Sequence, residues 1–376
     1  MKHRPFATQE MRVPLMRPRL PSASELLPYL ERIDRSQTYT NFGPLNDELE
    51  RRLQAWYEEE KGAESVYFVT TSSGTTALEV LLQSLNLSPS AKIIVPALTF
   101  VATATAVLRM GFEAVACDVD PDTVLMTPDS ISGVDLTAVE AVIPVATFGA
   151  PQNAEEWSKW SEQTGKKVII DAAAAFGGQA AAKNVPVAFS MHATKPLTSA
   201  EGGLVMTSDA EQAEAVRHLT NFGLPSNRKG VGANGKLSEY HAAVALASLD
   251  RWGETVRKRK TALRTYEKLL RDICGARLLE SIFFTYCPSV AIVRFSDTEL
   301  RDQCELRSAN SGIETRRWYS PLITDHPALR GRVSGGVEHP KARRAESQLL
   351  GLPFYAEISA GDIEGVVKAL GLACPT

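Results

Sequence analysis

Lys195 is the residue of this sequence with the clearest chemical potential, because it follows an expected strand and precedes the turn Glu201-Gly202-Gly203. Burial beside a strand end lowers the pKa of a lysine, and the neutral amine is the form that makes Schiff bases with carbonyl compounds. Ser190, five residues earlier, could bind a phosphate, and the Gly pair lets backbone approach a flat ring closely. A lysine in such a loop can also be an ordinary solvated charge. The hypothesis that Lys195 forms a Schiff base therefore depends on the residues around it.

A second segment, Ser73-Gly74-Thr75, joins an expected strand to an apolar helix. The free N–H groups at a helix start form an anion site, and a glycine there lets a phosphate lie against the backbone. The alternative is that Ser73 only caps the helix. Both interpretations stay open at this point.

Asp171 ends the apolar run Val168-Ile169-Ile170, at the end of a strand where α/β sheets bind ligands. A carboxylate in that position needs a cationic partner, and a protonated pyridine nitrogen would be one; the pair would make the ring an electron sink. A helix N-cap is the alternative role. An amine, a phosphate site and this carboxylate together predict pyridoxal 5'-phosphate (PLP) as cofactor, held on Lys195 as a Schiff base.

Two further candidates have ordinary alternatives. Phe100 could stack on a cofactor ring, although a single Phe is commonly a core residue. Asn234 could donate its amide to a phosphate, or it could be a turn residue. The stretch Gly230–Gly235 matches G-x-G-x-x-G, but it follows the polar loop 225–229 rather than a strand, so a dinucleotide site is rejected.

The elements that position these residues alternate along the chain between apolar strands and helices. We expect strands at Ser65–Val69, Lys92–Val95, Glu113–Asp118, Ala141–Pro144, Lys167–Asp171, Val185–Ser190 and Gly203–Thr207. Helices are expected at Ser22–Ile33, Asn46–Lys61, Thr75–Leu85, Val101–Met110, Ser238–Trp252 and Val256–Leu270. Continuous Val/Ile/Ala runs favour strands buried on both faces, which predicts an α/β fold with a mainly parallel seven-stranded sheet between helices.

The chain of 376 residues is longer than one hydrophobic core usually supports. We expect an N-terminal segment (1–44) that packs against the site or forms a substrate loop. A large cofactor-binding domain (45–252) and a smaller C-terminal α+β domain (253–376) follow it.

Composition restricts the partners and the location. A formal charge of -3 gives no reason to expect nucleic acid or an anionic membrane as partner, and no apolar run is long enough to span a bilayer. The five cysteines and six histidines are scattered, which argues against a disulfide framework and a metal site and favours the cytoplasm.

Taken together, the motifs resemble the DegT/StrS family of sugar aminotransferases, from about Gly43 to Leu370. The matching segments stand in the family's order: Gly43-Pro44, Ser73–Leu78, Pro96–Thr103, Asp118–Asp120, Asp171–Ala173, Ser190-x-His192-x-x-Lys195, Glu201–Gly203, Asn234–Glu239, Ala242-Ala243, Gly312–Arg316 and Leu352-Pro353. The resemblance implies the aspartate-aminotransferase-like fold, fold type I of PLP enzymes, with a homodimer as the assembly.

The resemblance also implies a role for each matching position. Lys195 would form the internal aldimine and move the proton between substrate and cofactor, while Asp171 would keep the ring nitrogen protonated. Phe100 would stack on the ring, and Asn234 would reach into the partner subunit's site. The remaining cofactor-binding positions are Ser73, Gly74, Thr75, Ala174, Ser190 and His192.

Three positions depart from the family's pattern. Ala174 stands where relatives often carry Gln or His near the ring hydroxyl, Ala146 replaces a common His, and Ile323 replaces the usual His after Pro321-Leu322. These positions face the cofactor or substrate in relatives, so we expect an unusual acceptor.

The reaction implied is transfer of an amino group from an amino acid, L-glutamate in most relatives, to a keto-sugar carried on a nucleotide diphosphate. An arginine-rich stretch, 316–344, could bind the pyrophosphate or could be a solvated loop. Two alternatives stay open: a PLP enzyme acting on a non-sugar ketone or aldehyde, and a PLP-binding regulatory protein with little turnover.

Overall fold

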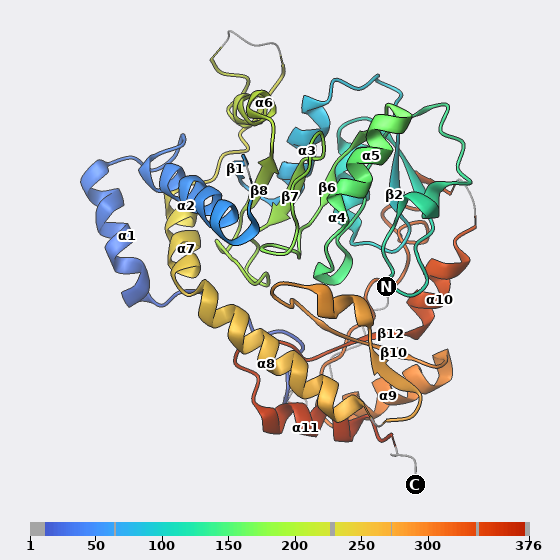
Figure 1. The fold of residues 1–376 in the computed structure, drawn as a ribbon. Coiled ribbons are helices and arrows are strands. Elements are labelled where there is room, and N and C mark those ends of the chain that lie inside the picture. Colours follow the sequence, from blue (N-terminus) through green and yellow to red (C-terminus); the bar gives the residue numbers. More distant parts are fainter. Residues whose placement is uncertain (1–11, 64, 226–229, 272, 336–337, 373–376) are drawn as a thin grey trace.

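The computed structural model describes residues 12–63, 65–225, 230–271, 273–335 and 338–372, so residues 1–11 of the expected N-terminal segment and Cys374 lie outside it. At its centre is a layer of short strands with helices on both faces (Figure 1). The strands of this layer are β1 (Tyr67–Thr71), β2 (Lys92–Pro96), β3 (Glu113–Cys117), β4 (Val139–Val142), β5 (Lys167–Val168), β6 (Ile170–Asp171), β7 (Val187–Ser190), β8 (Gly203–Thr207) and β11 (Val333–Gly335).

These strands pair in two groups, β1-β8-β7-β6 and β11-β3-β2-β4-β5. A parallel bridge between Val145 and Asp171 joins the two groups into one layer. The strands at the junction, β5 and β6, are also consecutive along the chain. The pairings of β8 with β1 and β7 are antiparallel, and all the others are parallel. The carboxyl ends of β1, β2, β4, β6 and β7 therefore meet at one edge, where such sheets place their ligands.

Helices cover both faces of the sheet because its side chains alternate in direction and both sets are apolar. Along β1, Phe68 packs with one hydrophobic cluster and Val69 with the other. On the Val69 side lie α3 (Gly74–Ser84), α4 (Val101–Arg109) and α6 (Ala210–Thr220). On the Phe68 side lie α2 (Pro44–Lys61), α5 (Ala154–Thr164) and α7 (Glu239–Asp250).

A second, antiparallel sheet lies in the C-terminal part, with strand order β12-β10-β9. Its strands are β9 (Ala276–Leu278), β10 (Ala291–Phe295) and β12 (Leu349–Leu352). The long helix α8 (Trp252–Leu270) leads from the large sheet into this part, where α9 (Thr298–Asn310), α10 (Pro340–Gln348) and α11 (Ala360–Ala369) pack (Figure 1). The expected C-terminal α+β unit is present, while the domain boundaries at 44 and 252 stay predictions.

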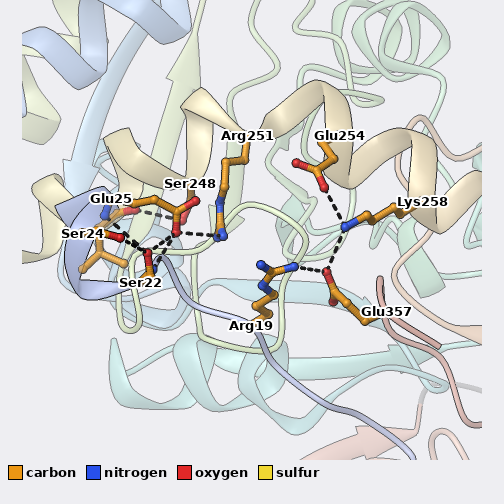
Figure 2. Close-up of polar contacts among 10 residues, drawn as sticks. Arg19, Ser22, Ser24, Glu25, Ser248, Arg251, Glu254, Lys258 and Glu357 are labelled. Atoms are coloured by element: carbon orange, nitrogen blue, oxygen red, sulfur yellow. Dashed lines mark hydrogen bonds and ion pairs between the residues drawn. The ribbon is translucent and has the colours of Figure 1, made fainter. Parts of the chain in front are cut away.

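The N-terminal segment crosses from the small sheet to α1 (Ala23–Ser36) and is held by ion pairs (Figure 2). Arg19 and Lys258 lie 2.6 and 3.4 Å from the same carboxylate oxygen of Glu357, and Glu254 pairs with Lys258 at 2.6 Å. Ser22 caps α1, and Glu25 completes the capping box and pairs with Arg251 at 3.3 Å. Exposed ion pairs contribute little energy singly, but this set fixes where the segment runs.

Two of the resembling motifs meet at the start of α2. The backbone N–H groups of Leu45 and Asn46 each donate to the buried carboxylate of Glu239, at 2.7 and 2.9 Å respectively. A carboxylate at this end of a helix binds free N–H groups and complements the helix dipole. Gly43 is required beside it, because a Cβ there would lie 2.7 Å from Cδ of Glu239.

The seven expected strands are present, with one broken in two: Lys167–Asp171 is interrupted at Ile169 and becomes β5 and β6. The first strand starts two residues later than expected, and Ser238 caps α7 as expected. The strand β11 was not expected, and it adds a further parallel strand beside β3. None of the described helices has the length and apolarity needed to cross a membrane.

Candidate active site

A cavity of about 410 Å³ opens at the edge where the parallel strands end. Asp171 at the end of β6, Ser190 at the end of β7 and the first turn of α3 line it, together with the loop that carries Lys195. Of the ten predicted site residues, nine line this cavity: Ser73, Gly74, Thr75, Phe100, Asp171, Ala174, Ser190, His192 and Lys195.

The carboxylate of Asp171 lies under the cavity floor and is only 5% exposed. Its Oδ2 accepts a hydrogen bond from the Thr103 hydroxyl at 2.7 Å, and its Oδ1 accepts one from the Ala173 N–H at 3.1 Å. Burial raises the pKa of Asp171, while these hydrogen bonds and the charge of Lys195 oppose that rise. Residues 172–178 form turns, so the helix N-cap alternative is wrong.

Lys195 faces the same cavity and interacts electrostatically with Asp171. Burial lowers the pKa of Lys195, and the Asp171 carboxylate opposes this shift. The lysine is therefore closer to the neutral, nucleophilic form than a solvated one would be. This placement excludes the interpretation of Lys195 as a solvated surface charge.

The first turn of α3, where an anion cradle is expected, lines the cavity. Ser73 caps the helix by accepting from the Thr76 N–H at 3.0 Å, so capping and cavity lining occur together. A Cβ on Gly74 would lie 2.8 Å from the Ser190 Cβ, which means that only glycine lets the helix start approach β7 this closely. A phosphate group fits here, between the free N–H groups of the first turn and the Ser190 hydroxyl.

Aromatic side chains form another wall. Phe100 is 51% exposed and lines the cavity, so it is not a core residue. Tyr319 packs near it with ring centroids 6.1 Å apart, and stacks on Phe148 at 5.5 Å. Burial raises the pKa of Tyr319, with the Asp171 charge adding to the effect. A flat aromatic cofactor ring fits the chemistry of this cavity, which both the Phe100 ring and Asp171 line.

His192 is held at the cavity by the residues after it. Its Nδ1 is 2.9 Å from the Thr194 hydroxyl, and its Nε2 is 3.5 Å from a carboxylate oxygen of Glu201. Both side chains are largely exposed within the open cavity. They therefore provide polar groups on the solvent side of Lys195.

Asn234 differs from the other nine predicted residues, because it is exposed and does not line the cavity of its own chain. It forms an isolated β-bridge with Asn221. The surrounding stretch Gly230–Gly235 contains no named strand.

Several residues of the cavity wall were not placed there by sequence reasoning, although the arginine-rich stretch 316–344 was considered for a pyrophosphate. Arg316, Trp318 and Tyr319 come from the C-terminal part, and the Arg316 guanidinium lies 4.2 Å from the Trp318 ring centroid. Met16 arrives from the N-terminal segment. The motif at 312–316 was noted, but nothing in its pattern places Arg316 in the same cavity as Lys195.

Of the three positions that depart from the family's pattern, two line the cavity and one does not. Ala146 and Ala174 line the cavity as small apolar groups. Ile323 is fully buried in the hydrophobic core, and its N–H donates to the Ala97 carbonyl oxygen. Ile323 does not line the cavity, so it cannot contact a bound cofactor directly.

The DegT/DnrJ/EryC1/StrS aminotransferase family model matches residues 22–371. The chain belongs to this family. The dTDP-4-amino-4,6-dideoxy-D-glucose transaminase of Shigella dysenteriae is 32% identical to it over 366 residues, which cover 94% of this chain and 96% of that protein.

Solved structures agree with this assignment. The structure of DesI determined in the presence of its TDP-sugar product is similar with a TM-score of 0.86 at 30% identity, covering 96% of this chain and 92% of DesI. A Bacillus cereus protein assigned as a PLP-dependent aminotransferase has the same TM-score at 26% identity, with 96% and 99% covered. This DegT/DnrJ/EryC1/StrS protein is accordingly a PLP-dependent aminotransferase of fold type I.

Within the described ranges, no three His, Cys, Asp or Glu side chains are grouped so that they could hold a metal ion. The four cysteines with described positions, Cys117, Cys274, Cys287 and Cys304, form no disulfide.

Proposed function

We propose that this enzyme moves an amino group from L-glutamate to a keto-sugar carried on a nucleotide diphosphate. The observation that carries the proposal is the convergence of Lys195, Asp171 and the α3 phosphate cradle on one cavity. The similarity to a dTDP-sugar transaminase supports the sugar as acceptor.

In this proposal each residue acts at a stated atom. Nζ of Lys195 would hold PLP covalently at rest and would carry the proton to and from the substrate carbon. The Asp171 carboxylate would keep a proton on the ring nitrogen, and the first turn of α3 with Ser190 would bind the phosphate. When bound, PLP would supply an electron sink for the charge left on the substrate carbon.

The arginine-rich stretch 316–344 contributes one residue to acceptor binding. Arg316 lines the cavity, and its planar fork suits a pyrophosphate. Others are engaged elsewhere: Arg317 pairs with Glu305 and Asp302, and Arg343 pairs with Asp325 at 2.7 Å. We therefore assign the acceptor's diphosphate to Arg316 rather than to the stretch as a whole.

The apolar wall at Ala146 and Ala174 limits how the acceptor is recognised, since neither side chain can donate a hydrogen bond. The acceptor's polar groups would then be bound by His192, Glu201 and Arg316, which line the cavity.

A homodimer completes the proposed site. Asn234 is exposed, and large apolar side chains near it are exposed too: Phe222 by 56%, Leu224 by 52%, Val231 by 88% and Tyr240 by 48%. Exposed apolar groups in one region are typical of an interface. We propose that a second copy covers this region and receives Asn234 at its cofactor phosphate, and that the enzyme acts in the cytoplasm.

The test is an absorbance spectrum of the purified enzyme with PLP, before and after addition of L-glutamate. The band of the lysine-bound cofactor should shift to that of the pyridoxamine form. A panel of nucleotide-linked keto-sugars, free keto-sugars and simple ketones and aldehydes should then restore the first band only with a nucleotide-linked sugar. Recovery with a simple ketone alone would replace the sugar by another acceptor, and absence of any shift would refute L-glutamate as donor.

A further inference from the structure

A basic hollow lies away from the cofactor cavity, between the small sheet and α10. Its volume is about 470 Å³, and it shares no lining residue with the Lys195 cavity. Five cationic side chains line it, from β9, β10, α10 and the end of α8. Among the described lining residues they face one carboxylate, that of Asp122. The cations are Arg271, Arg277, Arg294, Lys341 and Arg344.

Two of these arginines stand directly opposite each other. Arg277 of β9 and Arg294 of β10 are cross-strand partners in the antiparallel register. Like charges in that arrangement repel and destabilise a sheet. The sheet therefore carries an unfavourable pair of charges at the wall of the hollow. An anion bound between the two guanidinium groups would attract both and offset their mutual repulsion.

The protein itself satisfies these guanidinium groups only in part. Arg294 donates to the Asp122 carbonyl oxygen at 3.3 Å and lies 3.7 Å from its carboxylate, but its buried Nε has no hydrogen-bond partner among the described residues. The side chains of Arg277 and Arg344 form no hydrogen bond or ion pair with any residue that the structure describes. Buried donors without partners are uncommon and call for a ligand or water.

Electrostatics agrees with this geometry. Burial lowers the pKa of Arg294, and the charges of Arg277 and Arg344 lower it further, against the opposing charge of Asp122. The positive charges thus act on each other across the hollow. An anion bound among them would relieve that repulsion.

We propose that this hollow is a binding site for a compact polyanion that carries at least two phosphoryl groups. Arginine forks and an ammonium group on several sides match phosphoryl oxygens. The lining offers no exposed aromatic ring on which a base could stack, since Phe295 is 1% exposed. The phosphoryl groups, rather than an attached nucleoside, are therefore the recognised part.

The experiment is calorimetric titration of the PLP-loaded enzyme with inorganic pyrophosphate at low salt. PLP fills the α3 phosphate cradle, so pyrophosphate cannot bind there. Arg277→Gln and Arg344→Gln should each weaken binding about tenfold, because each removes charge-assisted hydrogen bonds. Both arginines are exposed, so these substitutions leave the core unchanged. Binding should also weaken as salt is raised.

Two variants serve as controls. Arg51→Gln makes the same charge change on exposed α2, next to the large sheet, and should leave binding unchanged. Arg316→Gln removes the diphosphate contact proposed in the cofactor cavity, so it should abolish only pyrophosphate bound there and leave the binding that depends on Arg277 unchanged. If Arg316→Gln weakens pyrophosphate binding while Arg277→Gln does not, the anion binds at the catalytic cavity and the proposal is refuted. If neither Arg277→Gln nor Arg344→Gln changes pyrophosphate affinity, the proposal is refuted as well.

Comparison of pyrophosphate with ADP, which carry the same number of phosphoryl groups, shows whether an attached nucleoside contributes to binding. Equal affinities would support a site for phosphoryl groups alone, and tighter ADP binding that still depends on Arg277 would support a nucleotide. These binding measurements do not depend on the acceptor of the aminotransferase, so they can fail while the proposed function holds.

Discussion

The hydroxyl of Thr103 on α4 donates a hydrogen bond to Oδ2 of Asp171 at 2.7 Å, and its own oxygen lies 3.1 Å from the hydroxyl of Thr99. All three side chains are at most 5% exposed. Two threonines one helical turn apart thus form a short hydroxyl chain under the cofactor cavity. Thr103 is not among the residues that line the cavity, so we assign it the role of a positioning residue for Asp171.

Replacing Thr103 by Val should lower kcat roughly tenfold or more, because a hydrogen bond to a charged group contributes about 1.5–3 kcal/mol. Burial already raises the pKa of Asp171, and the Thr103 hydrogen bond opposes this. Without it the pKa rises further, so the acidic limb of the kcat profile should move to higher pH. Thr103→Ser keeps the hydroxyl and should restore both values. An unmoved acidic limb in Thr103→Val would contradict this role.

The lowered pKa of Lys195 can be measured on enzyme freed of cofactor. The rate of covalent PLP uptake should rise with pH, with a midpoint below the ordinary lysine value of about 10.4. Asp171→Asn removes a charge that raises this pKa, so the midpoint should fall further. A midpoint at the ordinary value would disprove the effect of burial. Lys195→Ala should fold normally and show no band of lysine-bound cofactor.

The close approach of α3 to β7 predicts the effect of Gly74→Ala. The added Cβ would meet Ser190 at 2.8 Å from its Cβ, so the cradle must widen and PLP affinity should fall at least tenfold. Gly133→Ala is the matched control, because no atom lies within 4 Å of its added Cβ. Equilibrium dialysis of PLP measures both variants. Equal affinities in the two would show that the cradle does not depend on this contact.

The contact between Glu239 and the start of α2 should matter for stability. Glu239→Gln removes a charge that accepts two helix N–H groups, so the free energy of unfolding should fall by about 1–2 kcal/mol. Glu59→Gln changes an exposed carboxylate of the same helix and should stay within about 0.5 kcal/mol of wild type. Urea unfolding gives both values. If both variants lost a similar amount of unfolding free energy, Glu239 would act only through its charge at long range and not through its hydrogen bonds.

Much of this architecture can be read from local patterns. Lys195, Asp171 and Ser190 were found because each lies at or after the end of an apolar strand, and parallel strands bring such ends together. Glu239 was found as a motif without its role, since its partners at Leu45 and Asn46 are almost two hundred residues earlier.

Other features depend on tertiary packing that has no local signal. Tyr319 and Arg316 reach the cavity only because the C-terminal part packs over the strand ends. The repulsive Arg277 and Arg294 pair becomes visible only once the register of β9 and β10 is known. A three-residue strand such as β11 is too short for a periodic pattern.

The position of β11 bears on how the protein is made. This strand pairs with β3 more than two hundred residues earlier, and it forms the edge of the layer that carries the cofactor site. During synthesis, β3 therefore leaves the ribosome long before β11. Until β11 is made, the backbone groups on the outer edge of β3 stay unpaired, and such an edge favours association with other chains. Completion of the catalytic layer is thus among the last steps of biosynthesis, and a chain ending before Val333 would leave this edge permanently open.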